Sequence, residues 1–213
     1  MRSGTSDDFG RDLGDEIPAF RSGAAADQFV KLGIEVVDVS LPIAEIGLAT
    51  YYLIAPSETS SNLARYDGVR FGGKRDLFTQ EAMRRIMIGT FALSSGYSEA
   101  YYRKAQKVRT ILMEAYAKAY TQCDVLLMPI SPTVATKIGD LLSDPLANML
   151  ADLYTTTINQ VGLPSLALPA GFSKEGLPIG MQLVGQKFAE PTILALAHQY
   201  QLSTDWHTRS PKL

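Results

Sequence analysis

Apolar residues recur along this chain with two periods, one typical of helices and one typical of strands. A first helical pattern precedes Gly33, which suits the C-terminal cap of a helix, and its apolar positions are Phe20, Ala24, Phe29 and Leu32. The segment IEVVDVSLP follows with alternating β-branched residues and predicts a strand. A helix, a glycine and a strand in this order are typical of a protein in which helices cover a sheet.

Two longer helices are predicted in the middle of the chain. The first begins near Thr79 with Glu81 in its first turn, and its apolar face carries Met83, Ile86, Met87 and Thr90. Arg84 and Arg85 lie off that face. The second begins at Ser98 as its cap and extends for about six turns. Its apolar stripe, wide enough to cover a sheet, consists of Tyr101, Ala105, Val108, Leu112, Ala115 and Ala119.

A buried strand and a further helix are predicted next. CDVLLMPISP is a continuous apolar run that ends at prolines, which indicates a central strand. Asp144 and Pro145 begin a helix as its cap and first residue. Asp152 lies at the margin of that helix's apolar stripe, which consists of Leu146, Met149 and Leu153.

The last quarter of the chain predicts two strands and a helix. SLALP and IGMQLVG are strand-like runs that follow Gly162 and are joined by the turn-rich AGFSKEGLP. Pro191 then begins a final helix that ends near Gln201. Helices and strands in this order predict an α/β fold.

Composition and charge narrow the class of protein. The chain has 20 basic and 22 acidic side chains, and this net charge of -2 gives no electrostatic footprint for nucleic acid or an anionic membrane. The single Cys123 cannot form an internal disulfide, and without a cysteine and histidine set at metal-ligand spacing we expect no structural zinc and a reducing, cytoplasmic compartment. The polar, acidic start does not resemble a signal peptide, and no apolar run approaches the roughly 20 residues of a membrane span.

Residues 61–72, SNLARYDGVRFG, form a dense polar cluster. Such a cluster either takes part in chemistry or supports the loops around it. We favour support, because its side chains can bond loop backbone and one another while its glycines permit tight turns. The residues concerned are Asn62, Arg65, Asp67, Gly68 and Gly72.

The segment LSSGY places adjacent serines beside a glycine, as some hydrolase nucleophile loops do. Ser94 and Ser95 lie where a predicted helix ends at Gly96, without the strand-to-helix setting of a strained nucleophile loop, so we interpret them as capping residues. We interpret His198 and His207 as surface residues. No glycine motif for phosphate or dinucleotide binding occurs.

The residues alone allow two interpretations for one carboxylate and for two guanidinium groups. Asp152 is either a charge in an early helical turn or a ligand contact. Arg84 and Arg85 either belong to a solvated face or converge on a pocket. One guanidinium and one carboxylate in such a pocket would hold a free amino acid by its carboxylate and its ammonium.

Four ordered segments resemble the C-terminal half of the amidase signature family: YYLIAPSETSSNLARYDGVRFG, EAMRRIMIGTFALSSGYSEAYYRKAQKVR, DVLLMPISPTVA and GLPSLALPAGF with GLPIGMQLVG. Within the family, the likeness is strongest to the glutamine-hydrolysing A subunits of tRNA-dependent amidotransferases, and it extends from about Gly10 to about Gln201. The resemblance implies a mixed β-sheet covered by helices on both faces. It also implies that residues 1–213 are one partial amidase signature domain.

The same resemblance implies that the catalytic triad lies outside this chain. The family uses a Ser-cis-Ser-Lys triad in a glycine- and serine-rich stretch of its N-terminal half, and no segment here matches that stretch. We therefore expect the chain to be a fragment with no catalytic residue, no metal site and no activity by itself.

In glutamine-using members of the family, the substrate contacts fall on Tyr51, Arg85 and Asp152, with Tyr52 and Arg84 as one-residue alternates. The resemblance implies that Arg85 holds the α-carboxylate of glutamine and that Asp152 holds its α-ammonium. The implied partners are the B and C subunits of the amidotransferase, with ATP and Mg bound by one of these partners and tRNA reached only through it.

Two other functions remain open at this point. The chain could belong to a stand-alone amidase that acts on other amides, or it could be a truncated, non-catalytic module that docks on partner subunits. A missing half-domain would expose sheet edges, so self-association through an exposed edge is a further expectation.

Overall fold

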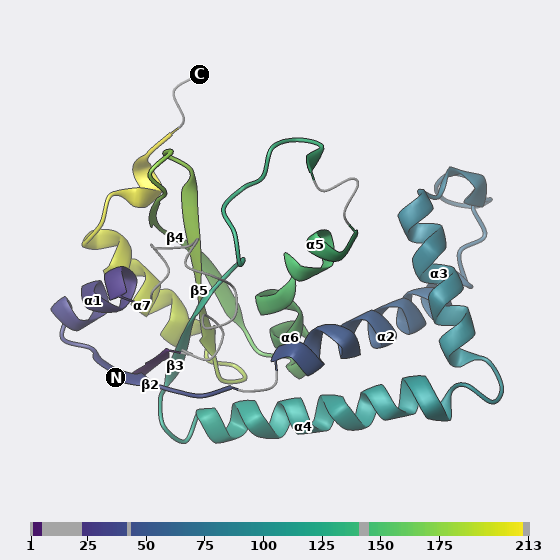
Figure 1. Ribbon diagram of the computed structural model, residues 1–213, viewed down its shortest axis with the longest axis horizontal. Helices are drawn as coiled ribbons and strands as arrows, with labels where there is room; N and C mark the ends of the chain where they lie inside the picture. Colours follow the sequence, from purple (N-terminus) through teal and green to yellow (C-terminus); the bar gives the residue numbers. More distant parts are fainter. Residues whose placement is uncertain (1, 6–22, 42–43, 141–144, 211–213) are drawn as a thin grey trace. The chain divides into compact units, whose positions relative to one another are not determined.

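The computed structural model describes residues 2–5, 23–41, 44–140 and 145–210 (Figure 1). Its contacts divide the chain into two compact units. We call Met1–Glu45 together with Leu112–Leu213 the sheet unit, and Ile46–Ile111 the helical unit. The predicted roles of Phe20 in a helix and of Asp144 as a cap lie outside the described residues.

The sheet unit contains five strands in the order β2-β1-β3-β5-β4. β1 (Arg2–Thr5) pairs in parallel with β2 (Glu35–Asp38) and with β3 (Val125–Pro129). β5 (Pro178–Gly185) pairs antiparallel with β3 and with β4 (Ser165–Phe172). The sheet is therefore mixed, and β3 is its middle strand, as the continuous apolar run predicted.

One hydrophobic core lies between the sheet and two helices, α1 (Gly23–Lys31) and α7 (Glu190–Leu202). Val125 and Leu127, which alternate along β3, both point into this core. Phe29 of α1 is fully buried there. In Figure 1, α1 and α7 lie on the same side of the strands.

A second core lies on the opposite face of the sheet. Leu126 and Met128 of β3 point into it, because successive side chains of a strand alternate between faces. It is covered by α6 (Leu153–Val161) and by the last turns of α4 (Lys104–Ala119). Helices therefore cover both faces of the sheet, and the predicted fold class is confirmed.

Most predicted element ends agree with the structure. Gly33 follows α1 with φ of +80°, as its cap position requires. α3 (Gln80–Leu93) begins after Thr79, whose hydroxyl accepts a hydrogen bond from the Ala82 N–H at 3.3 Å. The last helix begins one residue before Pro191.

One long helix was not predicted. α2 (Ala44–Leu63) includes the run YYLIAP, in which successive apolar residues leave no single hydrophobic stripe. Pro56 lies inside the helix, where a proline usually indicates its end. Because of both features, the periodicity of apolar residues does not indicate this helix.

The buried face of α3 differs from the predicted one. Met83 and Met87 of the predicted apolar face are 45% and 68% exposed. The buried residues of α3 are Gly89 and Ala92 instead. Small side chains mark this contact surface because they let a neighbouring backbone approach closely.

The helix predicted from Ser98 begins differently. Ser98 has helical backbone angles, and its side chain makes no capping hydrogen bond. A π-helical turn, η2 (Glu99–Arg103), comes first and runs directly into α4. The prediction of Ser98 as a cap was therefore wrong, although the helix itself is present.

The helix predicted from Pro145 is two helices. α5 (Pro145–Leu150) ends after six residues, and α6 begins at Leu153. Asp152 lies between them, at the position before the first residue of α6. Asp152 was predicted at the margin of an apolar stripe, but because of this break it comes directly before a new helix.

Two short 3-10 helices complete the described elements, η1 (Arg75–Leu77) and η4 (Trp206–Thr208). Trp206 is the only tryptophan of the chain, and its ring centroid lies 5.9 Å from that of Phe172 in β4. The Arg209 guanidinium carbon lies 4.4 Å from the Trp206 ring centroid. This cluster packs against the first core.

Candidate functional site

Helices α2 and α3 approach each other closely at one glycine of the helical unit. A Cβ atom added at Gly89 would lie 2.0 Å from the carbonyl oxygen of Pro56 and 2.8 Å from the Cβ of Ser60. Beside this contact, the hydroxyls of Ser60 and Thr90 share a hydrogen bond of 2.8 Å. Because Gly89 lies one turn after Arg85, the contact fixes the distance between the two helices next to that arginine.

Two predicted substrate residues are neighbours across these helices. Nη1 of Arg85 donates a hydrogen bond of 3.2 Å to the hydroxyl oxygen of Tyr51. The Tyr51 ring packs edge-on against Tyr52, with 5.1 Å between centroids, and the Arg85 guanidinium carbon lies 6.0 Å from the Tyr52 centroid. The Arg85 side chain is 28% exposed, so the pair presents a hydroxyl and a cationic fork at a partly open position.

Glu81 holds the guanidinium groups of both neighbouring arginines. Its Oε1 accepts from Nε of Arg85 at 2.6 Å and from Nη2 of Arg84 at 2.8 Å, and its Oε2 accepts from Nε of Arg84 at 2.7 Å. These hydrogen bonds, from Arg84 and then from Arg85, lower the pKa of Glu81 to about 2. The bond to Glu81, followed by the bond to Tyr51, raises the pKa of Arg85. At neutral pH the pair is therefore fully charged.

The bonds to Glu81 and Tyr51 also determine which N–H groups of Arg85 remain for another partner. A guanidinium group has five N–H donors, and the bonds to Glu81 and Tyr51 use Nε and one hydrogen of Nη1. The Nη2 group stays available. Glu81 was predicted only as a residue of the first helical turn, although its spacing of three and four residues before Arg84 and Arg85 was a usable signal.

The geometry distinguishes the two candidate arginines. Arg84 is 47% exposed and bonds to Glu81 along one edge, and this hydrogen bond raises its pKa. Arg85 is the arginine that reaches Tyr51. The arrangement favours Tyr51 with Arg85 over Tyr52 with Arg84 as a ligand-binding pair.

The third predicted residue, Asp152, belongs to the sheet unit and is half-buried. Its backbone carbonyl accepts hydrogen bonds from the N–H groups of Thr155 at 3.2 Å and Thr156 at 3.1 Å. Its carboxylate makes no capping bond. An anion is favourably placed relative to the helix dipole at this end of a helix, and a cationic ligand can pair with it there.

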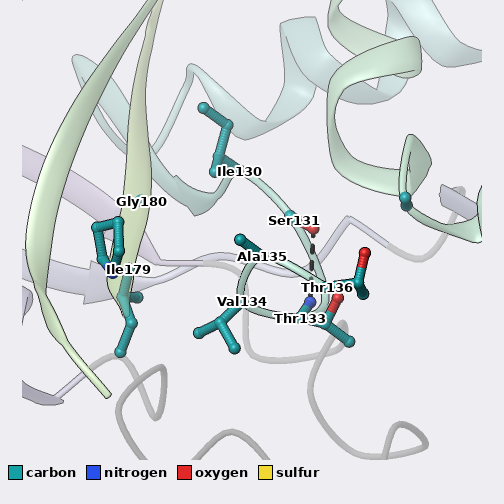
Figure 2. Close-up of a pocket in the computed structure, with 10 residues that line it drawn as sticks. Ile130, Ser131, Thr133, Val134, Ala135, Thr136, Ile179 and Gly180 are labelled. Atoms are coloured by element: carbon teal, nitrogen blue, oxygen red, sulfur yellow. Dashed lines mark hydrogen bonds between the residues drawn. The ribbon is translucent and has the colours of Figure 1, made fainter. Parts of the chain in front are cut away.

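A cavity of about 310 Å³ opens in the sheet unit next to the residue before Asp152. One wall is the loop after β3, and the start of β5 lies across from it; Figure 2 shows Ser131 and Thr136 in the loop and Gly180 in the strand. The Ser131 hydroxyl accepts a hydrogen bond of 3.5 Å from the Thr133 N–H. The described lining is uncharged and combines hydroxyl groups with apolar side chains.

The polar cluster of residues 61–72 supports its own loop. One carboxylate oxygen of Asp67 accepts a hydrogen bond of 2.9 Å from the Val69 N–H, and the other accepts one of 2.9 Å from Nε of Arg70. These bonds, the one from Val69 first, lower the pKa of Asp67. Gly68 and Gly72 have positive φ, as the predicted tight turns require.

Part of the support comes from a residue outside the cluster. Arg75 donates hydrogen bonds of 3.0 Å to the Ala64 carbonyl and 2.7 Å to the Tyr66 carbonyl, and so closes the C-terminal end of α2. Within the described part of the chain, the exposed side chains of Asn62 and Arg65 make no hydrogen bond. Their predicted share in the support was wrong.

The remaining sequence candidates have structural roles. Ser94 is the C-cap residue of α3, and its hydroxyl donates a hydrogen bond of 2.7 Å to the Phe91 carbonyl. His198 and His207 are exposed, as predicted.

Among the described residues, no group of three histidine, cysteine, aspartate or glutamate side chains could hold a metal ion. No helix in the described ranges is both long and apolar enough to cross a membrane.

Comparisons with known proteins agree with this architecture. The Amidase family model matches residues 2–194. The A subunit of glutamyl-tRNA(Gln) amidotransferase from Acaryochloris marina is 48% identical over 96% of this chain, and that from Ralstonia nicotianae is 45% identical over 95%. The crystal structure of the corresponding Thermotoga maritima protein aligns over 91% of this chain with a TM-score of 0.69 and 38% identity.

The matched region is only part of each relative. This chain spans 45% of the A. marina protein, 44% of the R. nicotianae protein and 40% of the T. maritima chain. The family model nevertheless covers almost all of the 213 residues. The mixed sheet, the helices on both of its faces and these matches together show that the chain belongs to the amidase family.

Proposed function

We propose that this chain is the C-terminal part of the glutamine-hydrolysing A subunit of a tRNA-dependent amidotransferase, and that residues 1–213 form one partial amidase signature domain. The observation that carries the proposal is the 48% identity to such a protein over 96% of this chain. In the whole protein, ammonia released from glutamine would pass to a cytoplasmic complex with the B and C subunits. There it would convert Glu-tRNA(Gln) to Gln-tRNA(Gln), with ATP, Mg and tRNA bound by one of these partners.

In this proposal, Arg85 and Tyr51 bind the α-carboxylate of glutamine. The Nη2 group of Arg85 and the remaining Nη1 hydrogen offer two parallel donors, which suit a carboxylate. The Tyr51 hydroxyl accepts from Arg85, so its own proton can be donated to the same ligand. Glu81 holds the fork in place before the substrate arrives, which lowers the entropy lost on binding.

Asp152 binds the α-ammonium of glutamine in the same proposal. Its carboxylate is half-buried and is not used for capping α6. Holding both charged ends of the amino acid would direct the side-chain amide toward a nucleophile supplied by the rest of the protein.

The full-length protein tests these assignments through its KM for glutamine. Arg85→Ala or Asp152→Asn should raise this KM by at least about thirtyfold, because losing one partner of a charge pair in a pocket costs about 2 kcal/mol or more. Ammonia-driven amidation should persist in both variants. Arg84→Ala is the matched control and should change the KM little. If either substitution abolished glutamine- and ammonia-driven activity together and lowered the melting temperature, the residue would be structural.

A second measurement concerns the polypeptide itself. The isolated 213-residue chain should release no ammonia from glutamine, since it contains no segment that resembles the family's triad. Preference of the full-length protein for simple aliphatic or aryl amides would indicate a stand-alone amidase instead.

Among the described strands, β2 and β4 are at the ends of the sheet order, and we propose them as the edges for contact with partner subunits or a second copy.

A further inference from the structure

A buried amide occupies the second core of the sheet unit. Gln182 of β5 is only 3% exposed, and its neighbours Met181 and Leu183 are fully buried on the opposite face of the sheet. By the alternation of the strand, its side chain shares a face with Val184, an apolar member of the second core. A buried amide is costly unless its polar atoms are hydrogen-bonded, so its partners indicate why it is there.

Gln182 is bonded to three different elements. Its Nε2 donates hydrogen bonds of 2.8 Å to the Pro129 carbonyl at the end of β3 and 3.2 Å to the Tyr154 carbonyl in the first turn of α6. Its Oε1 accepts a hydrogen bond of 3.0 Å from the Ser165 hydroxyl at the start of β4. The bond from Ser165 fixes which end of the amide carries the donors.

Both carbonyls that Gln182 holds lie next to the candidate site. Pro129 is followed directly by Ile130, the first residue of the loop that lines the cavity. Tyr154 lies two residues after Asp152, at the start of the same helix. One amide group therefore joins the backbone that leads into the cavity loop to the helical turn that carries the carboxylate.

We propose that Gln182 is a positioning residue, which fixes the first turn of α6, and with it Asp152, against the end of β3. A methionine of similar length would fill the same space but could not donate to either carbonyl. The first turn of α6 would then be held by packing alone. This inference rests on the proposed function only through the role of Asp152 in binding substrate.

The test uses the full-length protein, with Gln182→Met compared with Tyr120→Phe. The control removes a part-buried hydrogen bond to a backbone carbonyl of the same core, from the Tyr120 hydroxyl to the Val184 carbonyl at 3.0 Å, and this bond does not involve α6. We expect the melting temperatures of both variants to fall by similar amounts. Only Gln182→Met should raise the KM for glutamine, by about tenfold with kcat within about threefold, because a small displacement of a binding group weakens substrate binding.

Hydrogen exchange gives a readout that does not depend on the substrate. The N–H groups of Thr155 and Thr156 should exchange faster in Gln182→Met and at the parent rate in Tyr120→Phe. If the parent protein did not hydrolyse glutamine, the proposed function would fail, and this exchange result alone would decide the positioning role. If Gln182→Met did not fold, Ser165→Ala would replace it, since it frees the amide to rotate; we expect about a threefold rise in KM and faster exchange at the same two groups. Unchanged KM and unchanged exchange in the variant that folds would overturn the proposal.

Discussion

A single added methyl group at Gly89 should separate the two helices that carry Tyr51 and Arg85. The Cβ of Gly89→Ala would lie 2.0 Å from the Pro56 carbonyl oxygen, well inside ordinary van der Waals contact. This oxygen belongs to the backbone of α2 and cannot rotate away as a flexible side chain can. The helices must therefore move apart by about 1 Å.

The expected cost follows from two opposing effects. Overpacking of this kind costs up to about 3 kcal/mol, and the higher helix propensity of alanine offsets about 1 kcal/mol of it. The net loss of about 2 kcal/mol should lower the melting temperature by about 4–8 °C in a protein of 150–250 residues and by less in the longer full-length protein. Separation by 1 Å would also carry the 3.2 Å bond between Arg85 and Tyr51 beyond hydrogen-bonding distance.

Two measurements on the full-length protein check this prediction: thermal unfolding followed by circular dichroism, and the KM for glutamine. Loss of a hydrogen bond that fixes a charged group should raise the KM by about tenfold. Met87→Ala is the matched control, since Met87 is 68% exposed on the same helix and its loss should cost less than about 0.5 kcal/mol. A Gly89→Ala protein that melts at the parent temperature would show that the helices do not touch at Pro56. A lower melting temperature with an unchanged KM would refute the link between this contact and substrate binding.

Three further substitutions test separate parts of the structure. Because hydrogen bonds lower the pKa of Glu81 to about 2, its stabilising contribution is complete above its ordinary pKa near 4.5 and is lost as pH falls toward 2. Urea unfolding at pH 6 and pH 3 should show that Glu81→Gln removes this part of the acid sensitivity, worth only about 0.5 kcal/mol because the side chain is 51% exposed. Tyr51→Phe should raise the KM for glutamine about fivefold with kcat unchanged, whereas Tyr52→Phe should not; equal effects would remove the distinction between the two tyrosines. Thr157→Val removes the buried hydrogen bond of 2.9 Å between Thr157 and Tyr116, and should cost about 1–2 kcal/mol in urea unfolding without altering the KM; a changed KM would link this core to the site.

Four of the five described strands and most helices of the sheet unit were predictable from the sequence because burial and periodicity agree there, whereas β1 lies in the polar start of the chain, where no strand was predicted. β3 is buried on both faces, which produces a continuous apolar run, and Gly33 lies where α1 ends. In the helical unit, Thr79 likewise lies where α3 begins. α2 was missed because it lacks a single stripe and contains Pro56. Its neighbour α3 packs through Gly89, a residue that carries no hydrophobic signal at all.

The candidate site was only partly accessible to sequence reasoning. The resemblance to the family singled out Tyr51 and Arg85, and the hydrogen bond between them is a tertiary contact that no local pattern encodes. The spacing of Glu81 from both arginines was visible in the sequence. Only the side-chain geometry shows which N–H groups of Arg85 Glu81 occupies and which remain available. The role of Gln182 could not be predicted for a different reason. A polar residue in a buried strand is unusual, and its position is explained only by the carbonyls to which it donates hydrogen bonds.

The position of Trp206 makes the sheet unit distinguishable by fluorescence. The chain has one tryptophan, and it lies against Phe172 and Arg209 at the edge of the first core. Intrinsic emission excited at the red edge of the absorption band will therefore report on the sheet unit alone, whereas far-ultraviolet dichroism will report on the helices of both units. Two probes with different midpoints in the same denaturant would reveal sequential melting of the units, and coincident midpoints would show that the two units unfold as one cooperative block.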